Sequence, residues 1–339
     1  MTKTNKITYK TLLYPLLAVA LLYFVYIQIP DPTKVWTAIK TANYGFVGLA
    51  ALAGLTSHFT RALRWKLLIE PMGYTSRLKT SFYAVMVGYT VNYALPRVGE
   101  VARCTLKGQL DNVPVDKLLG TVVTERVFDV LVTLLVTVLA VVTQYDLIVD
   151  FLADLLNQDQ QGTQMKLVLL GGLAVMGIVG LVIYNWLRKR ENNSAILVKL
   201  LDIVEGILTG VKSIFKLKKP WLFVFYTLVI WFMYFMVNYL VFMALPETSH
   251  LGLDAAVVTL VVATVAVIIP APGGLGSFHY FVPLGLTLLY GIDKNPATSY
   301  AFISHASQMI MICVLGGISM IAAGFLKRQK RNEVAGSGE

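Results

Sequence analysis

The sequence predicts an all-α polytopic membrane protein with six full spans and two broken hairpins, either re-entrant or built from paired half-helices, in an inverted repeat. Three observations indicate this fold class. The 339 residues are 56% hydrophobic and only 14% charged, whereas soluble domains average about 25% charged residues. Apolar runs long enough to cross a bilayer recur along the chain. Two further apolar runs are interrupted by proline and glycine.

The full spans follow from length, because a helix needs roughly 20 apolar residues to cross a bilayer. Six segments qualify, at about residues 11–29, 44–66, 120–143, 166–187, 221–243 and 298–325. The first resembles a signal peptide, but its apolar run of about 18 residues exceeds the ~7–15 of a signal sequence, and no small-residue cleavage site follows. We therefore expect an uncleaved first span. Residues 195–215 repeat apolar side chains at helical spacing and predict an amphipathic helix in the membrane interface.

The two interrupted regions are residues 81–108 and 254–292. The first is broken at Pro96 and Gly99, and the second at IIPAPGGLG, Ile268–Gly276. Proline removes a backbone donor and breaks a helix, whereas glycine permits tight turns. In hydrocarbon, irregular backbone survives only where it is buried in protein or lines a water-filled cavity. We therefore expect two hairpins whose tips present helix N-termini, which attract anions, near the middle of the membrane.

The orientation follows from lysine and arginine, which stay on the cytoplasmic side. With the N-terminus inside and each broken region returning to its own side, about 25 of the 29 basic residues lie inside. The exceptions are Lys34, Lys40, Lys166 and Lys294. The net charge of +10 therefore reflects membrane topology, and we expect no nucleic-acid partner. The predicted location is the cytoplasmic (inner) membrane, with both termini cytoplasmic.

The two broken regions predict an internal repeat. LPRVGE (Leu95–Glu100) aligns with IPAPGG (Ile269–Gly274), and the same offset carries the second span onto the fifth and the third onto the sixth. The first broken region starts and ends inside and the second starts and ends outside, so the halves face opposite ways. The prediction is one transmembrane domain (1–326) with pseudo-repeats at about 11–143 and 166–325, and a basic, disordered cytoplasmic tail (327–339). Such repeats place a transporter site at their interface.

Charged side chains gather at the first break and on the third span. Arg97 and Arg103 are planar donors suited to a phosphate, and Glu100 lies between them. Glu125 and Asp129 lie four residues apart in TERVFDV and share a helix face. Ionisable groups within spans usually face a cavity or a partner. With the glycines and histidine of the second break, the candidate substrate-binding residues are Arg97, Glu100, Arg103, Glu125, Arg126, Asp129, Gly273, Gly274 and His279.

Structural alternatives stay open for these motifs. The charges could form salt bridges that fix the first hairpin to the third span, or lie at the cytoplasmic interface, where charge costs little. RALRWKLL (Arg61–Leu68) favours a positive-inside anchor with Trp65 in the interface. PAPGG could be only a tight helical corner, and the expected packing or surface histidines are His58, His250 and His305.

Enzyme classes find little support in the sequence. It has no metal-ligand spacing of Cys and His, no HExxH, no GxSxG and no phosphate-binding loop. Ser277 lies near His279 in the sequence, but no spacing supports a catalytic dyad. We expect no enzymatic activity, no metal and no cofactor, so that any transport is driven by a gradient, a partner or equilibration.

Four motifs together resemble the lysylphosphatidylglycerol synthase transmembrane region family, also called flippase-like or UPF0104 membrane proteins. They are RALRWKLLI (61–69), NYALPRVGEVAR (92–103), TERVFDV (124–130) and PAPGGLGSFHYF (270–281), in the family's order. The resemblance implies a polytopic helical domain that can move lysyl-phosphatidylglycerol between leaflets, and it assigns the family's polar positions to the charged residues above. It also implies a stand-alone membrane half without a synthase domain. Where the family often has Glu, this chain has His279, which suggests different cargo or a pH-sensitive group.

We therefore expect a lipid translocase that moves a phospholipid or lipid-linked headgroup between leaflets through a polar central cavity. Arg97 and Arg103 would hold the phosphate, and the carboxylates would hold an amine or a proton. The alternative is a non-transporting membrane subunit that scaffolds a separate lipid-modifying enzyme. The cargo does not follow from the fold.

Overall fold

The structure, a computed structural model, describes residues 31–147, 217–269 and 271–336 and a few single residues between 19 and 29. In these parts of the chain the regular elements are all helical. Three helices are long and apolar enough to cross a membrane: α6 (Val115–Thr143), α10 (Pro220–Phe242) and α13 (Lys294–Gly336). The protein is therefore an all-helical membrane protein.

Four of the six predicted spans coincide with described helices, namely α3 (Tyr44–Ile69), α6, α10 and α13. Helix α3 has 26 residues but carries His58, Arg61, Arg64 and Lys66 in its second half, which lowers its hydropathy. The predicted span at 166–187 and the predicted amphipathic helix at 195–215 lie outside the described residues. The predicted span at 11–29 also lies outside them, except for a few single residues.

A short helix that we did not predict, α2 (Pro32–Thr41), precedes α3. The carboxylate of Asp31 accepts hydrogen bonds from the backbone N–H groups of Thr33 and Lys34, and proline is the first helical residue. An acidic N-cap followed by proline is a favourable helix start, because it satisfies backbone donors that lack helical partners.

The first predicted break is confirmed. Helix α4 (Leu78–Ala94) ends two residues before Pro96, and α5 (Val98–Asp111) begins two residues after it. The N–H of Val98 donates to the Leu95 carbonyl (3.2 Å), and Arg97 has φ 68° and ψ −11°. This geometry is that of a type II turn, whose third position usually requires glycine. The first tip therefore holds an arginine in a left-handed conformation.

The second predicted break is also confirmed. Helix α11 (Leu253–Ile268) ends at the PAPGG motif, a single 3-10 turn follows (η2, Pro272–Gly274), and α12 (Ser277–Tyr290) begins after it. The backbone reverses through Gly273 (φ 56°) and Gly276 (φ 86°), which only glycine adopts readily.

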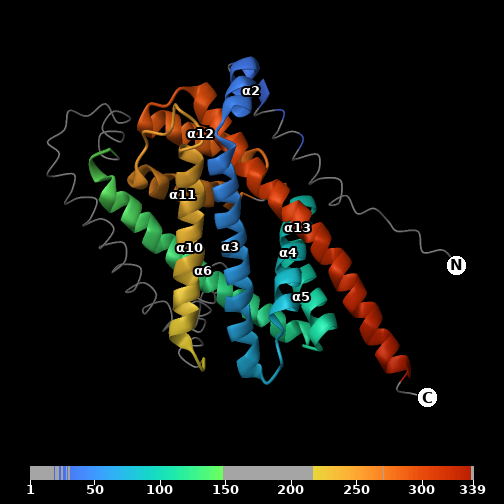
Figure 1. The fold of residues 1–339 in the computed structure, drawn as a ribbon. Helices are drawn as coiled ribbons and strands as arrows, with labels where there is room; N and C mark the ends of the chain where they lie inside the picture. The colour runs from blue at the N-terminus through green and yellow to red at the C-terminus, as the bar shows by residue number, and fades with distance from the viewer. Residues whose placement is uncertain are drawn as a thin grey trace, which may run out of the picture.

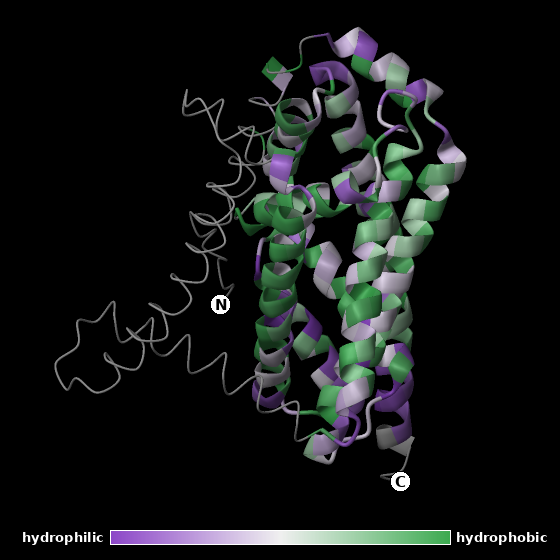
Figure 2. Ribbon diagram, turned by 90° about the vertical axis from the view of Figure 1, so that its left-hand side faces the viewer, coloured by the Kyte–Doolittle hydropathy of each residue, from purple (hydrophilic) through white to green (hydrophobic). Residues whose placement is uncertain are grey.

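The helices pack in a compact bundle in which the two hairpins lie toward opposite ends (Figure 1). Helices α3 and α10 run antiparallel, because the N–H of Asn43 donates to the Ala244 carbonyl (2.8 Å) at one end and Arg64 contacts Thr227 further along. Helix α4 packs against α13, and α11 packs against α6. Hydrophobic residues dominate much of the length of the long helices, and hydrophilic residues gather near the ends of the bundle (Figure 2).

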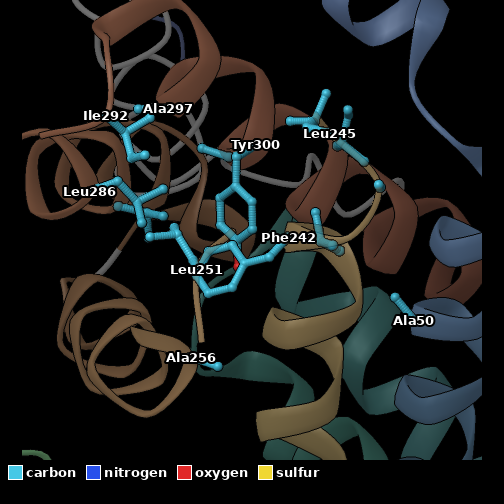
Figure 3. Packing of buried hydrophobic residues seen from close by; sticks show 14 of the residues in the cluster. Ala50, Phe242, Leu245, Leu251, Ala256, Leu286, Ile292, Ala297 and Tyr300 are labelled. Atoms are coloured by element: carbon cyan, nitrogen blue, oxygen red, sulfur yellow. The ribbon is translucent and has the colours of Figure 1, made fainter. Parts of the chain in front are cut away.

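The largest hydrophobic cluster joins the ends of α10, α11, α12 and α13 around Tyr300 and Phe242 (Figure 3). Their rings lie 4.9 Å apart, and the Tyr300 hydroxyl donates to the carbonyl of Asn238 (3.2 Å). A second cluster packs around Trp65 and Phe223, between α3, α4, α5, α6 and α10. Each hairpin is therefore held by its own apolar core.

The predicted disorder of the tail is not found as far as residue 336. Helix α13 continues to Gly336, and the ammonium group of Lys330 donates to the Asn112 side chain (2.5 Å) and to the Gln109 carbonyl (3.3 Å). These contacts satisfy the C-terminal end of α5, where cations are favoured. As far as residue 336 the tail is helical, and Lys330 gives it a partner on the first hairpin that composition alone does not reveal.

Candidate functional site

The candidate site is a buried network of ion pairs between three helices. Arg61 and Arg64 come from α3, Glu125 and Asp129 from α6, and Arg103 from α5. Each of these residues is at most 9% exposed. The spacings of three residues on α3 and four on α6 put each pair on one helix face, so that the two faces meet.

The two network carboxylates of α6, Glu125 and Asp129, are each shared between cations. Asp129 receives Arg61 (Nη1 to Oδ2, 3.1 Å) and Arg64 (Nη1 to Oδ1, 2.9 Å). Glu125 receives Arg103 (Nη2 to Oε2, 2.5 Å) and lies 4.0 Å from the Nε of Arg64. A buried ionised group is costly unless it is paired, and these contacts provide the pairing.

Neighbouring side chains fix the guanidinium planes. Arg61 donates to the Tyr234 hydroxyl (2.9 Å) and Arg64 to the Thr227 hydroxyl (3.1 Å), both on α10. The Arg103 guanidinium lies over the Trp65 ring, 4.8 Å from its centroid. The network therefore joins the first hairpin to helices from both halves of the chain.

A second, more exposed layer lies beside this network. Arg126 pairs with Glu100 (2.6 Å) and approaches Asp129 (3.8 Å), and its side chain is 47% exposed. Glu100 and Arg103, both on α5, thus contact α6 through two separate ion pairs. These two ion pairs are the salt bridges between the first hairpin and the third predicted span that the structural alternative described.

Several donors of the network have no hydrogen-bond partner among the described residues. They are Arg61 Nε, Arg64 Nε and Nη2, and Arg103 Nε, and the acceptor Glu125 Oε1, 4.0 Å from Arg64 Nε, is likewise unpaired. Four guanidinium groups, counting Arg126, share three carboxylates. A buried donor without a partner is unfavourable. The cluster therefore has both the charge and the free N–H groups to bind an anion.

A narrow pocket lies against the network between α4, α5 and α6. Its lining includes Tyr89, Asn92, Glu100, Arg103 and Arg126. It has room for about one water molecule. The polar central cavity that we predicted is therefore, at this point of the structure, too small for a lipid headgroup.

The helix N-terminus at the first tip is partly occupied. The N–H of Gly99 donates to the Asn92 side chain (2.8 Å), and that of Val98 donates within the turn. Arg97 is exposed and forms no ion pair with any described residue. The structure thus brings five of the predicted residues together, three in the network and two in the layer beside it, and leaves Arg97 outside both.

The remaining predicted residues form a separate cluster where the tips of the two hairpins meet. A Cβ atom at Gly273 would lie 1.9 Å from the Tyr93 ring, so only glycine admits this contact. His305 lies within hydrogen-bonding distance of the Gly273 carbonyl (2.9 Å) and beside His279. The hydroxyl of Ser277 donates to the backbone carbonyl of Gly274 (3.2 Å) rather than to a histidine, which gives no support to a catalytic dyad.

The interpretation of RALRWKLL as an interfacial anchor is wrong. Arg64 and Trp65 are fully buried, and Arg61 is 4% exposed. The positive-inside pattern cannot separate this case from an anchor, because the acidic partner is on another helix. The available signal was the three-residue spacing of the arginines together with two carboxylates on one face of the TERVFDV helix.

Comparison with known proteins places the chain in a family. The lysylphosphatidylglycerol synthase TM region family matches residues 11–316. A UPF0104 membrane protein of Methanocaldococcus jannaschii is 21% identical over 85% of this chain and 88% of its own length. The glycosyltransferase AglD of Haloferax volcanii is 23% identical over 92% of this chain, which spans 53% of that protein. No solved structure matches the chain.

The family match covers the charged hairpin, the buried network and the second break, which are the parts of the chain that hold the site. The two relatives extend the similarity over most of the chain. The chain is a multi-pass membrane protein that belongs to the lysylphosphatidylglycerol synthase transmembrane region (UPF0104) family.

Proposed function

We propose that this protein is a lipid translocase, which moves a phospholipid or lipid-linked headgroup between the leaflets of the membrane. The observation that supports this most is the buried arginine network, in which Arg103 keeps an unused N–H donor and lines a pocket together with Glu100 and Arg126. A network with a purely structural role would gain nothing from buried donors that lack a partner, because each such donor costs free energy. A phosphate group, with its charge and several acceptor oxygens, would satisfy them.

The inverted repeat belongs to this proposal, and the helix contacts support it. The hairpin arms have nearly equal lengths, 17 and 14 residues for α4 and α5 against 16 and 14 for α11 and α12. Contacts also occur in matching pairs: α4 with α13 and α11 with α6, α5 with α6 and α12 with α13, α3 with α4 and α10 with α11. The antiparallel α3 and α10 would then lie on either side of the pseudo-twofold axis. The network would lie at the repeat interface, where such folds bind substrate.

The charged residues that line the pocket would divide between two roles. Arg103 and Arg126 line the pocket and would hold the phosphate by charge-assisted hydrogen bonds. Glu100 also lines the pocket, where its carboxylate would accept hydrogen bonds from an amine or hydroxyl of the headgroup. Arg97, exposed at the tip, would meet the headgroup on its way in. Because the pocket holds about one water molecule, we take this structure as the closed conformation.

The orientation is part of the proposal. The basic ends of α3 and α13 would lie at the cytoplasmic face of the inner membrane, as the positive-inside rule requires. The first hairpin would enter from that face and the second from the opposite face. No catalytic step is assigned to the chain. The relative named as a glycosyltransferase is compatible with a role in a lipid pathway, but its activity does not transfer with the fold.

The test is translocation in proteoliposomes. Purified protein is placed in phosphatidylcholine vesicles with a trace of NBD-labelled phosphatidylglycerol, and the label in the outer leaflet is bleached with dithionite. Glu100→Gln and Arg126→Gln change half-exposed groups and should allow folding. We expect each to lower the rate about tenfold or more, as the loss of a charge-assisted hydrogen bond implies.

Lys66→Ala is the matched control. Lys66 follows Arg64 by two residues but forms a partly exposed pair with Glu70 (3.4 Å), outside the network. We expect the Lys66→Ala variant to translocate lipid at the rate of the unaltered protein. We expect Arg97→Ala to lower the translocation rate by slowing the entry of the headgroup. If the Glu100 and Arg126 variants fold normally and translocate at the unaltered rate, the pocket beside the network does not bind the headgroup.

The second candidate function is a non-transporting subunit that scaffolds a lipid-modifying enzyme. The ion pairs between α5 and α6 favour it, because they hold the first hairpin in place. Purification of a stoichiometric enzyme with this chain, together with no translocation by the chain alone, would support it. Translocation by the purified chain would exclude the scaffold as its sole function.

A further inference from the structure

Two buried imidazoles meet at the second break. His279 on α12 is 5% exposed and His305 on α13 is 8% exposed, and their ring centroids are 4.8 Å apart. In the tautomer with hydrogen on Nε2, His305 donates to the Gly273 carbonyl (2.9 Å). The Nδ1 atom of His279 is buried and has no hydrogen-bond partner among the described residues.

The histidine pair takes the same place in its half of the chain as an ion pair in the other half. Glu100 is the third residue of α5 and pairs with Arg126, the twelfth residue of α6. His279 is the third residue of α12 and faces His305, the twelfth residue of α13. The second half therefore has two protonatable imidazoles where the first half has an ion pair.

The surroundings of the pair are aromatic. The ring of Phe302 lies 4.6 Å from that of His279, and the ring of Phe278 lies 5.3 Å from that of His305. The titratable group that faces the pair from another element is Tyr93 of α4, 6.2 Å from His305. Neither imidazole forms an ion pair with a described carboxylate. A proton on the pair would thus add an uncompensated charge to an apolar site, which is unfavourable while the tips stay packed.

We propose that His279 and His305 together form a proton-binding site that couples lipid translocation to proton movement across the membrane. The inference rests on the proposed function and adds its energy source. In the tautomer with hydrogen on Nε2, Nδ1 of His279 carries a lone pair without a partner among the described residues. A hydronium ion transfers its proton to that lone pair and leaves as water, and the proton later leaves to water on the other side of the membrane. Two imidazolium ions at this separation would repel each other, so the pair binds one proton.

The coupling would act through the contact between the tips. His305 holds the carbonyl of Gly273, and Tyr93 of the first hairpin packs on that same glycine. A charged pair favours water, so protonation favours the conformation in which the tips separate. Loss of the proton favours the packed tips of the described structure. A ligand or proton shifts such an equilibrium only by its differential affinity for the two conformations.

The first measurement is the ratio of NBD-phosphatidylglycerol translocation rates with and without an imposed pH gradient, in vesicles with the membrane potential clamped. We expect the unaltered protein to respond several-fold. The ratio should fall to about one in His279→Asn and in His305→Asn. It should also fall to about one in the double variant His279→Glu/His305→Arg, which copies the ion pair of the first half and keeps the site polar. If the translocation rate of the unaltered protein does not change with the pH gradient, the coupling is refuted while the proposed function still stands.

The second measurement does not depend on transport. Titration of ¹⁵N-histidine signals in detergent, assigned with His→Asn variants of the chain's four histidines, should show that the pair binds one proton in total, and that either single substitution changes the signal of the other imidazole. Two independent titrations, or no proton binding from pH 4 to 8, would overturn the proposal even if no lipid moves.

Discussion

The substitution Glu125→Gln tests whether the buried network is held by charge. Glu125 is fully buried, lies 2.5 Å from a guanidinium nitrogen of Arg103 and 4.0 Å from one of Arg64. Glutamine keeps the shape and one acceptor oxygen but removes the negative charge. Two guanidinium groups then share a site in which Asp129 is the remaining carboxylate on that face of α6.

The expected cost is large because both cations stay buried. Removing one member of a buried ion pair typically costs about 3–5 kcal/mol. A single pair at about 4 Å contributes about 4 kcal/mol at the effective dielectric constant of ~20 that suits partly buried sites. We therefore expect Glu125→Gln to lower the free energy of unfolding by about 3–5 kcal/mol. Adding Arg103→Gln should return about 1–3 kcal/mol of this, because it removes the unpaired cation.

The assay is reversible unfolding in mixed micelles with increasing SDS, followed by tryptophan fluorescence. Lys66→Ala, which breaks a partly exposed ion pair on α3, is the matched control and should cost less than about 1 kcal/mol. A loss below about 1 kcal/mol for Glu125→Gln would refute the reasoning. Strict additivity with Arg103→Gln would also refute it, because the two residues would then not interact.

Three further predictions concern the hairpins, each read out by the same unfolding assay or by hydrogen exchange. Gly99→Ala should destabilise the protein by about 1–3 kcal/mol, because its Cβ would lie 1.9 Å from the carbonyl oxygen of Gly88. The control Gly120→Ala, which has open space around it, should be neutral or stabilising by up to about 1 kcal/mol. Equal effects of the two substitutions on stability would show that α4 and α5 do not pack closely. Arg97→Gly should stabilise the protein by about 1 kcal/mol, since glycine relieves the left-handed φ of 68°, and a loss of stability would argue against this turn. Lys330→Ala should speed amide exchange in the last turn of α5 and beyond residue 327 of α13, because it removes the contacts that join them; unchanged exchange would mean that the lysine does not hold the tail.

The breaks in the helices could be predicted because they follow from local backbone chemistry. Proline cannot continue a helix and glycine admits positive φ, so the local sequence around Pro96 and Gly273 is enough to predict that the helices end there. The same holds for the face of α6 that carries Glu125 and Asp129, since helical spacing alone brings them together.

The partners of those carboxylates could not be predicted. Arg61 and Arg64 come from α3, more than sixty residues away, and a basic residue near a span end has the same local signature whether it meets water or a buried acid. The tail helix was missed for the same reason, because Lys330 acquires its partners only in the folded chain. Helix α2 did have a local signal, the Asp31 cap followed by proline, which the search for long apolar runs passes over.

The exposed position of Arg97 shows where chemical type misleads. Arg97 and Arg103 are equally good phosphate donors, yet the type II turn puts the first at the exposed tip and α5 puts the second in the core. Which arginine is buried depends on the turn geometry, and position 97 would normally favour glycine there.

The most direct test of the central claim is a reversible cross-link between the two tips. In a variant without Cys104 and Cys313, Tyr93→Cys and Gly273→Cys put two thiols where the tips touch. The account predicts that oxidation forms the cross-link and stops translocation of NBD-phosphatidylglycerol, that reduction restores it, and that neither single variant responds to oxidation. A cross-link that forms in full while translocation continues at the same rate would contradict the claim that the tips must part for a lipid to cross.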